Sequence, residues 1–156
     1  MLEADIPGYG ELRLTNLVLD VNGTVAEGGE LLPGVAERLA ALSNTLTAVA
    51  VTADTQGTAA SLGEALGIKV HVIESGHEAL QKLALVEELD PDTVVAVGNG
   101  ANDALMLRAC ALGICVLGPE GAARGTWESA DIVVTDILDA LDILAHPKRL
   151  VATLRS

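Results

Sequence analysis

Carboxylate, hydroxyl and ammonium side chains recur at or near the ends of apolar segments in this sequence. Asp20 stands inside an apolar run, Thr52 ends the next one, Lys82 lies in a helical pattern, and Asp103 follows a glycine-rich run. A carboxylate among apolar residues costs several kcal/mol unless it is paired, hydrogen-bonded or bound to a metal. If Asp20 were the only such residue, its side chain could simply cap the turn that follows it. The whole set instead predicts phosphoryl transfer through an aspartyl-phosphate on Asp20, with Mg²⁺ bridging carboxylate and phosphate.

The elements that must position these residues alternate between strand and helix patterns. Short apolar runs bounded by turn residues predict buried strands over residues 17–21, 46–51, 68–73, 93–97, 112–117 and 131–134. Amphipathic periodicity and helix-stop signals predict helices over residues 33–42, 56–66, 76–88, from 103 to about 111, 136–145 and 147–154. This order predicts an α/β fold, a doubly wound parallel sheet with helices on both faces. Ligands bind such a sheet beyond the carboxyl ends of its strands.

Two smaller features flank this pattern. Residues 11–14 alternate polar and apolar side chains, so we expect a half-exposed strand at an edge. Gly28 and Gly29 separate two short apolar pieces, which predicts a small hairpin beside Asp20.

Composition limits the class of protein. The 156 residues suit one domain over residues 1–156. The net charge of −13 opposes nucleic acid as a partner, since that affinity rests on Lys and Arg. No apolar stretch approaches the roughly 20 residues that span a bilayer, and the amino terminus carries Glu3 and Asp5 rather than positive charge. We therefore expect a soluble, cytoplasmic protein without a membrane partner.

Four segments, namely residues 20–24, residues 48–54 with Thr52, Lys82, and the glycine-rich run of residues 98–103, resemble the four motifs of the haloacid dehalogenase-like (HAD) phosphohydrolase superfamily over about residues 15–135. The run that contains Asp103 also resembles the phosphorylation domain of P-type ATPases, and the nearest resemblance is to their small soluble relatives. The resemblance implies that Asp20 is the nucleophile and a Mg²⁺ ligand, and that Thr52 hydrogen-bonds the phosphoryl group. It further implies that Lys82 neutralises that group and that Asp103 supports the metal.

Two positions depart from the superfamily's pattern. Many of its phosphatases carry an Asp two residues after the nucleophile as general acid and base, where this sequence has Asn22. An amide cannot transfer that proton, and the loss typically costs about 10²–10⁴ in rate. Asn99 stands where the superfamily's pattern has a metal-binding Asp. The predicted Mg²⁺ ligands are therefore Asp20, Asn22, Asn99 and Asp103, and this set carries one negative charge fewer than the superfamily's usual set.

Two other interpretations of these residues are weaker. The glycine-rich run follows a strand and opens a helix, as dinucleotide-binding loops do, but Asp103 stands where that fingerprint needs its last glycine. A phospho-receiver domain also combines Asp, Thr and Lys, but it needs an acidic pair at its first strand, where Asp20 stands alone.

Two functions remain open. One is a slow Mg²⁺-dependent HAD-type phosphatase or phosphotransferase, and the other is a regulatory module that binds Mg²⁺ and phosphate or holds a phosphoaspartate without turnover. Only 31 residues separate Asp20 from Thr52 and 29 separate Thr52 from Lys82, which leaves no room for an inserted cap domain. We therefore expect a site roofed only by the hairpin and open to water. A phosphorylated substrate, a phosphoprotein partner or a symmetric homo-oligomer would complete it.

Overall fold

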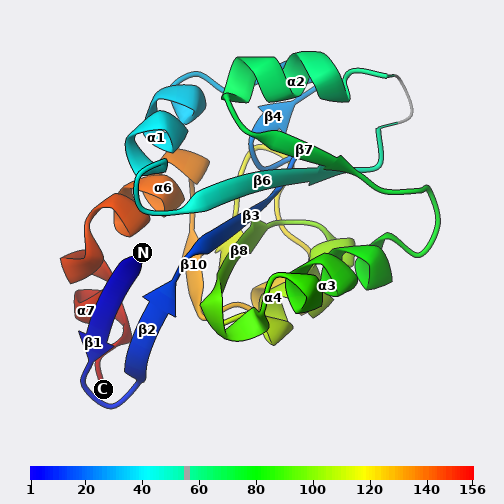
Figure 1. Cartoon of the computed structure of the whole chain (residues 1–156). Helices are drawn as coiled ribbons and strands as arrows, with labels where there is room; N and C mark the ends of the chain where they lie inside the picture. Colours follow the sequence, from blue (N-terminus) through cyan, green and yellow to red (C-terminus); the bar gives the residue numbers. More distant parts are fainter. Residues whose placement is uncertain (55–56) are drawn as a thin grey trace.

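The computed structural model describes residues 1–54 and 57–156 (Figure 1). A six-stranded sheet forms its central layer, in the order β10-β9-β8-β3-β6-β7, and every neighbouring pair in it is parallel. Its strands are β3 (Asn16–Asp20), β6 (Thr47–Thr52), β7 (Lys69–Val72), β8 (Val94–Gly98), β9 (Leu112–Val116) and β10 (Ile132–Val134). The predicted α/β class and parallel sheet are confirmed.

Helices cover both faces of this sheet (Figure 1). They are α1 (Val35–Leu42), α2 (Ala59–Leu66), α3 (Glu78–Glu88), α4 (Ala104–Ala109), α5 (Arg124–Trp127), α6 (Ile137–Ala145) and α7 (Pro147–Leu154), with 3₁₀ turns η1 (Pro91–Thr93) and η2 (Ala101–Asp103). Leu17 and Leu19 pack in one core cluster with α1 and α6, whereas Val18 packs in another with α3 and α4. Because side chains alternate across a strand, β3 is buried on both faces and Asp20 follows Val18 toward the α3 side.

The predicted helix over residues 56–66 is shorter in the structure. Helix α2 begins at Ala59, and its predicted first residue, Gln56, lies outside the described residues. The Asp54 carboxylate accepts a hydrogen bond from the backbone of Ala59 at 2.6 Å, so a side chain that precedes the helix satisfies a free amide of its first turn.

The amino-terminal segment differs from the expected edge strand. β1 (Leu2–Ile6) and β2 (Gly10–Leu14) pair antiparallel in a two-stranded sheet of their own. Every second residue of β1 is buried, and the strand packs against α7 (Figure 1). The prediction missed β1 because its alternation is short and runs directly into a turn.

The predicted hairpin is present as β4 (Ala26–Glu27) and β5 (Glu30–Leu31). Gly28 and Gly29 join the strands with φ angles of 57° and 84°. A two-residue type I′ turn needs positive φ at both positions, which glycine adopts without steric cost.

The sheet topology places a crevice beside β3. From β3 the chain passes to β6 on one side, and after β7 it crosses to β8 on the other side of β3. Ligands bind α/β sheets where the strand order reverses in this way. The intervals expected to be too short for a cap hold β4, β5 and α1 before Thr52, and α2 and β7 before Lys82. In the described part of the chain, no helix is both long and apolar enough to cross a membrane.

Candidate active site

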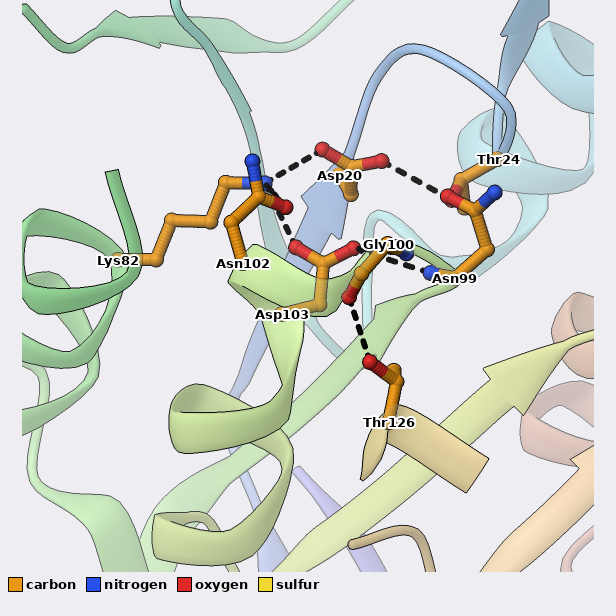
Figure 2. A network of polar contacts seen from close by, with 8 residues as sticks. All are labelled: Asp20, Thr24, Lys82, Asn99, Gly100, Asn102, Asp103 and Thr126. Atoms are coloured by element: carbon orange, nitrogen blue, oxygen red, sulfur yellow. Dashed lines mark hydrogen bonds and ion pairs between the residues drawn. The ribbon is translucent and has the colours of Figure 1, made fainter. Parts of the chain in front are cut away.

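Asp20, the last residue of β3, meets Lys82 of α3 at the carboxyl edge of the sheet (Figure 2). The Lys82 ammonium donates to Asp20 Oδ1 at 2.6 Å, and both residues are buried, with exposed fractions of 2% for Lys82 and 8% for Asp20. Only tertiary packing makes this pair, since 62 positions separate the two residues. Asp20 is therefore not the water-exposed carboxylate expected from an uncapped site.

Asp103 holds Lys82 from the other side. Its Oδ1 accepts from the same ammonium at 2.6 Å, and its Oδ2 accepts from the backbone amides of Asn99 and Gly100 at 3.0 and 2.9 Å. Asp103 is fully buried and does not line the cavity at Asp20. Because both oxygens are engaged, its carboxylate positions Lys82 and the turn after β8, and its role as a direct Mg²⁺ ligand stays a prediction.

The same arrangement explains why the glycine-rich run is no dinucleotide loop. The Asp103 carboxylate itself occupies the amides of Asn99 and Gly100, the donors that a pyrophosphate would need. A side chain at Gly98 would place its Cβ 2.5 Å from the Asp103 carboxyl carbon. Gly98 is thus required for the close approach of a carboxylate.

Oxygen atoms suited to Mg²⁺ converge beside Asp20. The Thr24 hydroxyl lies 3.2 Å from Asp20 Oδ2 and 3.3 Å from Asn99 Oδ1 (Figure 2). The Thr24 hydroxyl has one proton, so it donates to either Asp20 Oδ2 or Asn99 Oδ1 at a time. The oxygen that does not accept this hydrogen bond keeps that lone pair free. Asn22, which is exposed, lines the same cavity. A carboxylate and amide oxygens are hard donors of the kind that Mg²⁺ takes, so these residues fit the ion.

The charges of the cluster shift its pKa values. Burial raises the pKa of Asp20 to about 6, and the charge of Asp103 adds to the rise, while Lys82 and Thr24 oppose it. Burial lowers the pKa of Lys82, but the charges and hydrogen bonds of the two carboxylates outweigh it and raise that pKa above its usual value. Two buried carboxylates sharing one ammonium leave one negative charge without a partner, and a bound cation would compensate it.

A groove leads from this cavity toward α2. Thr52, buried at the end of β6, and Asn22 line both the cavity at Asp20 and the groove, whose volume is about 460 Å³. The hairpin supplies Gly28, Gly29 and Leu31 to its wall, and α2 supplies Ser61, Leu62 and Ala65. The site thus has a second wall besides the hairpin that the sequence predicted as its only roof.

Several site residues had no assigned role in the sequence analysis. Thr24 joins Asp20 and Asn99, and Asn102 lies 3.3 Å from the Lys82 ammonium. Thr126, which is fully buried, donates to the Gly100 carbonyl at 2.5 Å and braces the turn. Glu120 lines the cavity at Asp20. Thr24 lies two residues after Asn22, and Asn102 directly precedes Asp103, so both stand next to residues that the sequence singles out, whereas no sequence signal marks Thr126 or Glu120.

Replacing Lys82 tests the electrostatic role of the cluster. Lys82→Met leaves two buried carboxylates without a counter-charge, and breaking a buried pair in this way costs about 3–5 kcal/mol. We expect that loss in the free energy of unfolding at pH 8, measured by urea denaturation, and a smaller loss at pH 5, where Asp20, whose pKa is raised to about 6, takes up a proton. Lys148→Met, which removes an exposed charge of α7, should change stability by less than about 0.5 kcal/mol. Equal losses in both variants would contradict a special role for Lys82.

Asp20→Asn should stabilise the metal-free protein. The folded-state pKa of about 6 exceeds the ordinary value of 3.8, so ionised Asp20 opposes folding fully above pH 6 and not at all below about pH 4. The shift corresponds to about 3 kcal/mol. Thermal unfolding in a chelator should show Asp20→Asn above wild type at pH 8 and near it at pH 4. Asp5→Asn, in an exposed position of β1, should show no such pH-dependent gain.

Comparison with known proteins agrees with this geometry. A family model described as haloacid dehalogenase-like hydrolase matches residues 1–111. An uncharacterized protein of Methanocaldococcus jannaschii is 48% identical over 92 residues, which cover 56% of this chain and 99% of that relative. A probable copper-transporting ATPase of Arabidopsis thaliana is 30% identical over 146 residues, which are 85% of this chain but only 14% of the ATPase.

Solved structures share the fold. A 3-deoxy-D-manno-octulosonate 8-phosphate phosphatase from Moraxella catarrhalis, in complex with magnesium and phosphate ions, superposes with a TM-score of 0.69 at 17% identity, covering 91% of this chain and 94% of its own. At that identity the likeness concerns the fold, whereas the family match spans most of the chain. The chain belongs to the haloacid dehalogenase-like hydrolases.

Proposed function

We propose that this hydrolase is a Mg²⁺-dependent phosphohydrolase that acts through an aspartyl-phosphate on Asp20. The observation that carries the proposal is a buried carboxylate at the carboxyl edge of β3, held by the Lys82 ammonium at 2.6 Å and facing a cavity. A buried, oriented carboxylate beside a cation suits nucleophilic attack on phosphorus, since the ammonium neutralises charge on the transferring group.

The site residues divide the reaction among them. An Asp20 oxygen attacks phosphorus while the bond to the leaving oxygen breaks, and the leaving group takes up a proton from solvent. Water then attacks the phosphorus, the bond between phosphorus and the Asp20 oxygen breaks to free the carboxylate, and inorganic phosphate leaves after the attacking water has given a proton to solvent. Thr52 would donate its hydroxyl to the phosphoryl oxygens, and Asp103 keeps Lys82 aimed at them. Asp20, Asn22 and Asn99 would hold Mg²⁺, which when bound supplies positive charge to the phosphoryl oxygens.

Asn22 supports the proposal of slow turnover. It is exposed at the cavity, in the position where an acid would reach the leaving oxygen, but its amide can neither donate nor accept a proton for the reaction. The aspartyl-phosphate should therefore be long-lived. This observation favours a second candidate function, a module that holds phospho-Asp20 and acts through a partner without turnover.

The groove supports a substrate preference. Among the described residues that line it, none is cationic, and Asp54 contributes a carboxylate. Lys82 is engaged by Asp20 and Asp103, so it offers little to a second anionic group. We propose a phosphate monoester whose leaving group is neutral or cationic. A groove of this volume suits a small phosphorylated molecule better than the phosphoprotein partner or the homo-oligomer expected for an open site.

Intact mass measurement during turnover tests the proposal and separates the two functions. The protein is incubated with acetyl phosphate or p-nitrophenyl phosphate and Mg²⁺, and both free phosphate and protein mass are followed. We expect slow phosphate release together with a phosphate adduct that decays slowly, neither of which forms with Asp20→Asn or in a chelator. A stable adduct without release of phosphate would instead establish the second candidate function, a module that holds phospho-Asp20 without turnover. Wild-type rates from Asp20→Asn would exclude Asp20 as the nucleophile.

Asn22→Asp should accelerate turnover. The new carboxyl group can protonate the leaving oxygen and then activate water, a contribution of roughly 10²–10⁴ in rate. Steady-state hydrolysis of p-nitrophenyl phosphate, with a matching shortening of the adduct lifetime, measures the effect. Asn44→Asp makes the same chemical change at an exposed turn and should leave the rate unchanged. An Asn22→Asp variant that folds normally but is no faster than wild type would refute the assignment.

A further inference from the structure

We infer that Glu120 supplies the second carboxylate of the cation site at Asp20 and takes over the charge that is absent at Asn99. The inference rests on the proposed function, because it concerns the site where Mg²⁺ would bind. Glu120 belongs to none of the four motifs and lies in the loop between β9 and α5. It nevertheless lines the same cavity as Asp20, Asn22 and Asn99.

The loop that carries Glu120 is fastened to Asn99 by two hydrogen bonds. The Asn99 side-chain amide donates to the Gly121 carbonyl at 3.1 Å, and the Ala123 amide donates to the Asn99 carbonyl at 2.9 Å. Within the loop, the Gly121 amide donates to the Gly118 carbonyl at 2.8 Å and closes a tight turn around Glu120. The backbone of Glu120 is therefore held against Asn99, independently of any contact of its side chain.

Gly23 leaves room for the Glu120 carboxylate beside Asn99. A side chain at residue 23 would place its Cβ 2.5 Å from Glu120 Oε2 and 2.5 Å from Asn99 Nδ2. Glu120 Oε2 and Asn99 Nδ2 thus both lie beside the Cα of Gly23. The distance between these two atoms is at most twice 2.5 Å. The turn of residues 20–24, which carries the nucleophile, accordingly has the carboxylate of Glu120 on its surface.

The negative charges of Glu120 and Asp20 favour the binding of a cation between them. Within the described residues, Glu120 has no hydrogen bond or ion pair, and Lys82 is engaged by Asp20 and Asp103. An unpaired carboxylate near Asp20 is repelled by it, in a chain whose net charge is already −13. Mg²⁺ is usually bound by one or two carboxylates together with neutral oxygens and water. Because Asn99 is neutral, Glu120 brings the carboxylates at this site to two, acting directly or through water.

Glu120 could instead activate water in place of the acid that Asn22 lacks. The two roles differ in one measurable respect, since a base affects turnover without changing cation affinity. The proximity to the amide of Asn99, the position that lacks the family's charge, favours the cation role.

Direct cation binding tests the inference without relying on activity. Mn²⁺ is the probe, and free Mn²⁺ is counted by electron paramagnetic resonance with the intact protein at fixed pH and ionic strength. We expect Glu120→Gln to raise the Kd about tenfold, because one charge near a divalent cation is lost. Glu88→Gln removes the same charge at the last residue of α3, where it is exposed, and should change the Kd less than twofold. Asp20→Asn should abolish binding and thereby identify the site.

A double variant tests whether the loss of charge, rather than another effect of Glu120→Gln, changes the Kd. Adding Asn99→Asp to Glu120→Gln returns a carboxylate to the site and should bring the Kd back to within about threefold of wild type. Wild-type affinity in Glu120→Gln, with binding still lost in Asp20→Asn, would overturn the inference and leave the proposed function standing. Slower turnover at unchanged affinity would overturn it in favour of water activation. Absence of any Mn²⁺ binding by wild type would overturn both the inference and the metal dependence of the proposed function.

Discussion

The buried ion cluster of Asp20, Lys82 and Asp103 is the interaction on which the rest of the site depends. Its members come from β3, α3 and η2, so the cluster forms only when these three elements are packed together. Charges taken out of water are tolerated only when they are paired and hydrogen-bonded. The structure meets this demand with the backbone amides after β8, with the Thr24 hydroxyl and with the absence of a side chain at Gly98.

The cluster also leaves one negative charge uncompensated, and this imbalance connects the fold to its chemistry. Burial raises the pKa of Asp20 to about 6, so its ionised form is disfavoured in the empty site, and a bound cation would lower that pKa. As the proposed nucleophile, ionised Asp20 would be stabilised by a bound cation rather than by the empty site. The neutral amides of Asn22 and Asn99 remove charge from the same place, which makes the nearby carboxylate of Glu120 more important than its exposed position suggests.

Much of the fold could be predicted because local patterns encode it. Apolar runs predicted all six strands of the main sheet, and paired glycines predicted the hairpin of β4 and β5. These signals report which residues avoid water and which adopt positive φ, and neither property needs a partner elsewhere in the chain. β1 escaped prediction because its five residues are stabilised by β2 and α7 rather than by their own pattern.

For the candidate site, the sequence by itself determined which side chains stand at the carboxyl ends of strands, and hence that Asp20, Thr52 and Asn99 share one edge of the sheet. Only the tertiary structure decided how they are used. It buried Asp20, turned both Asp103 oxygens toward Lys82 and backbone amides, and brought Thr126 and Glu120 to the site from after β9. The reason is physical, since burial, pairing and pKa depend on atoms that lie a few ångströms away but many residues apart in the chain.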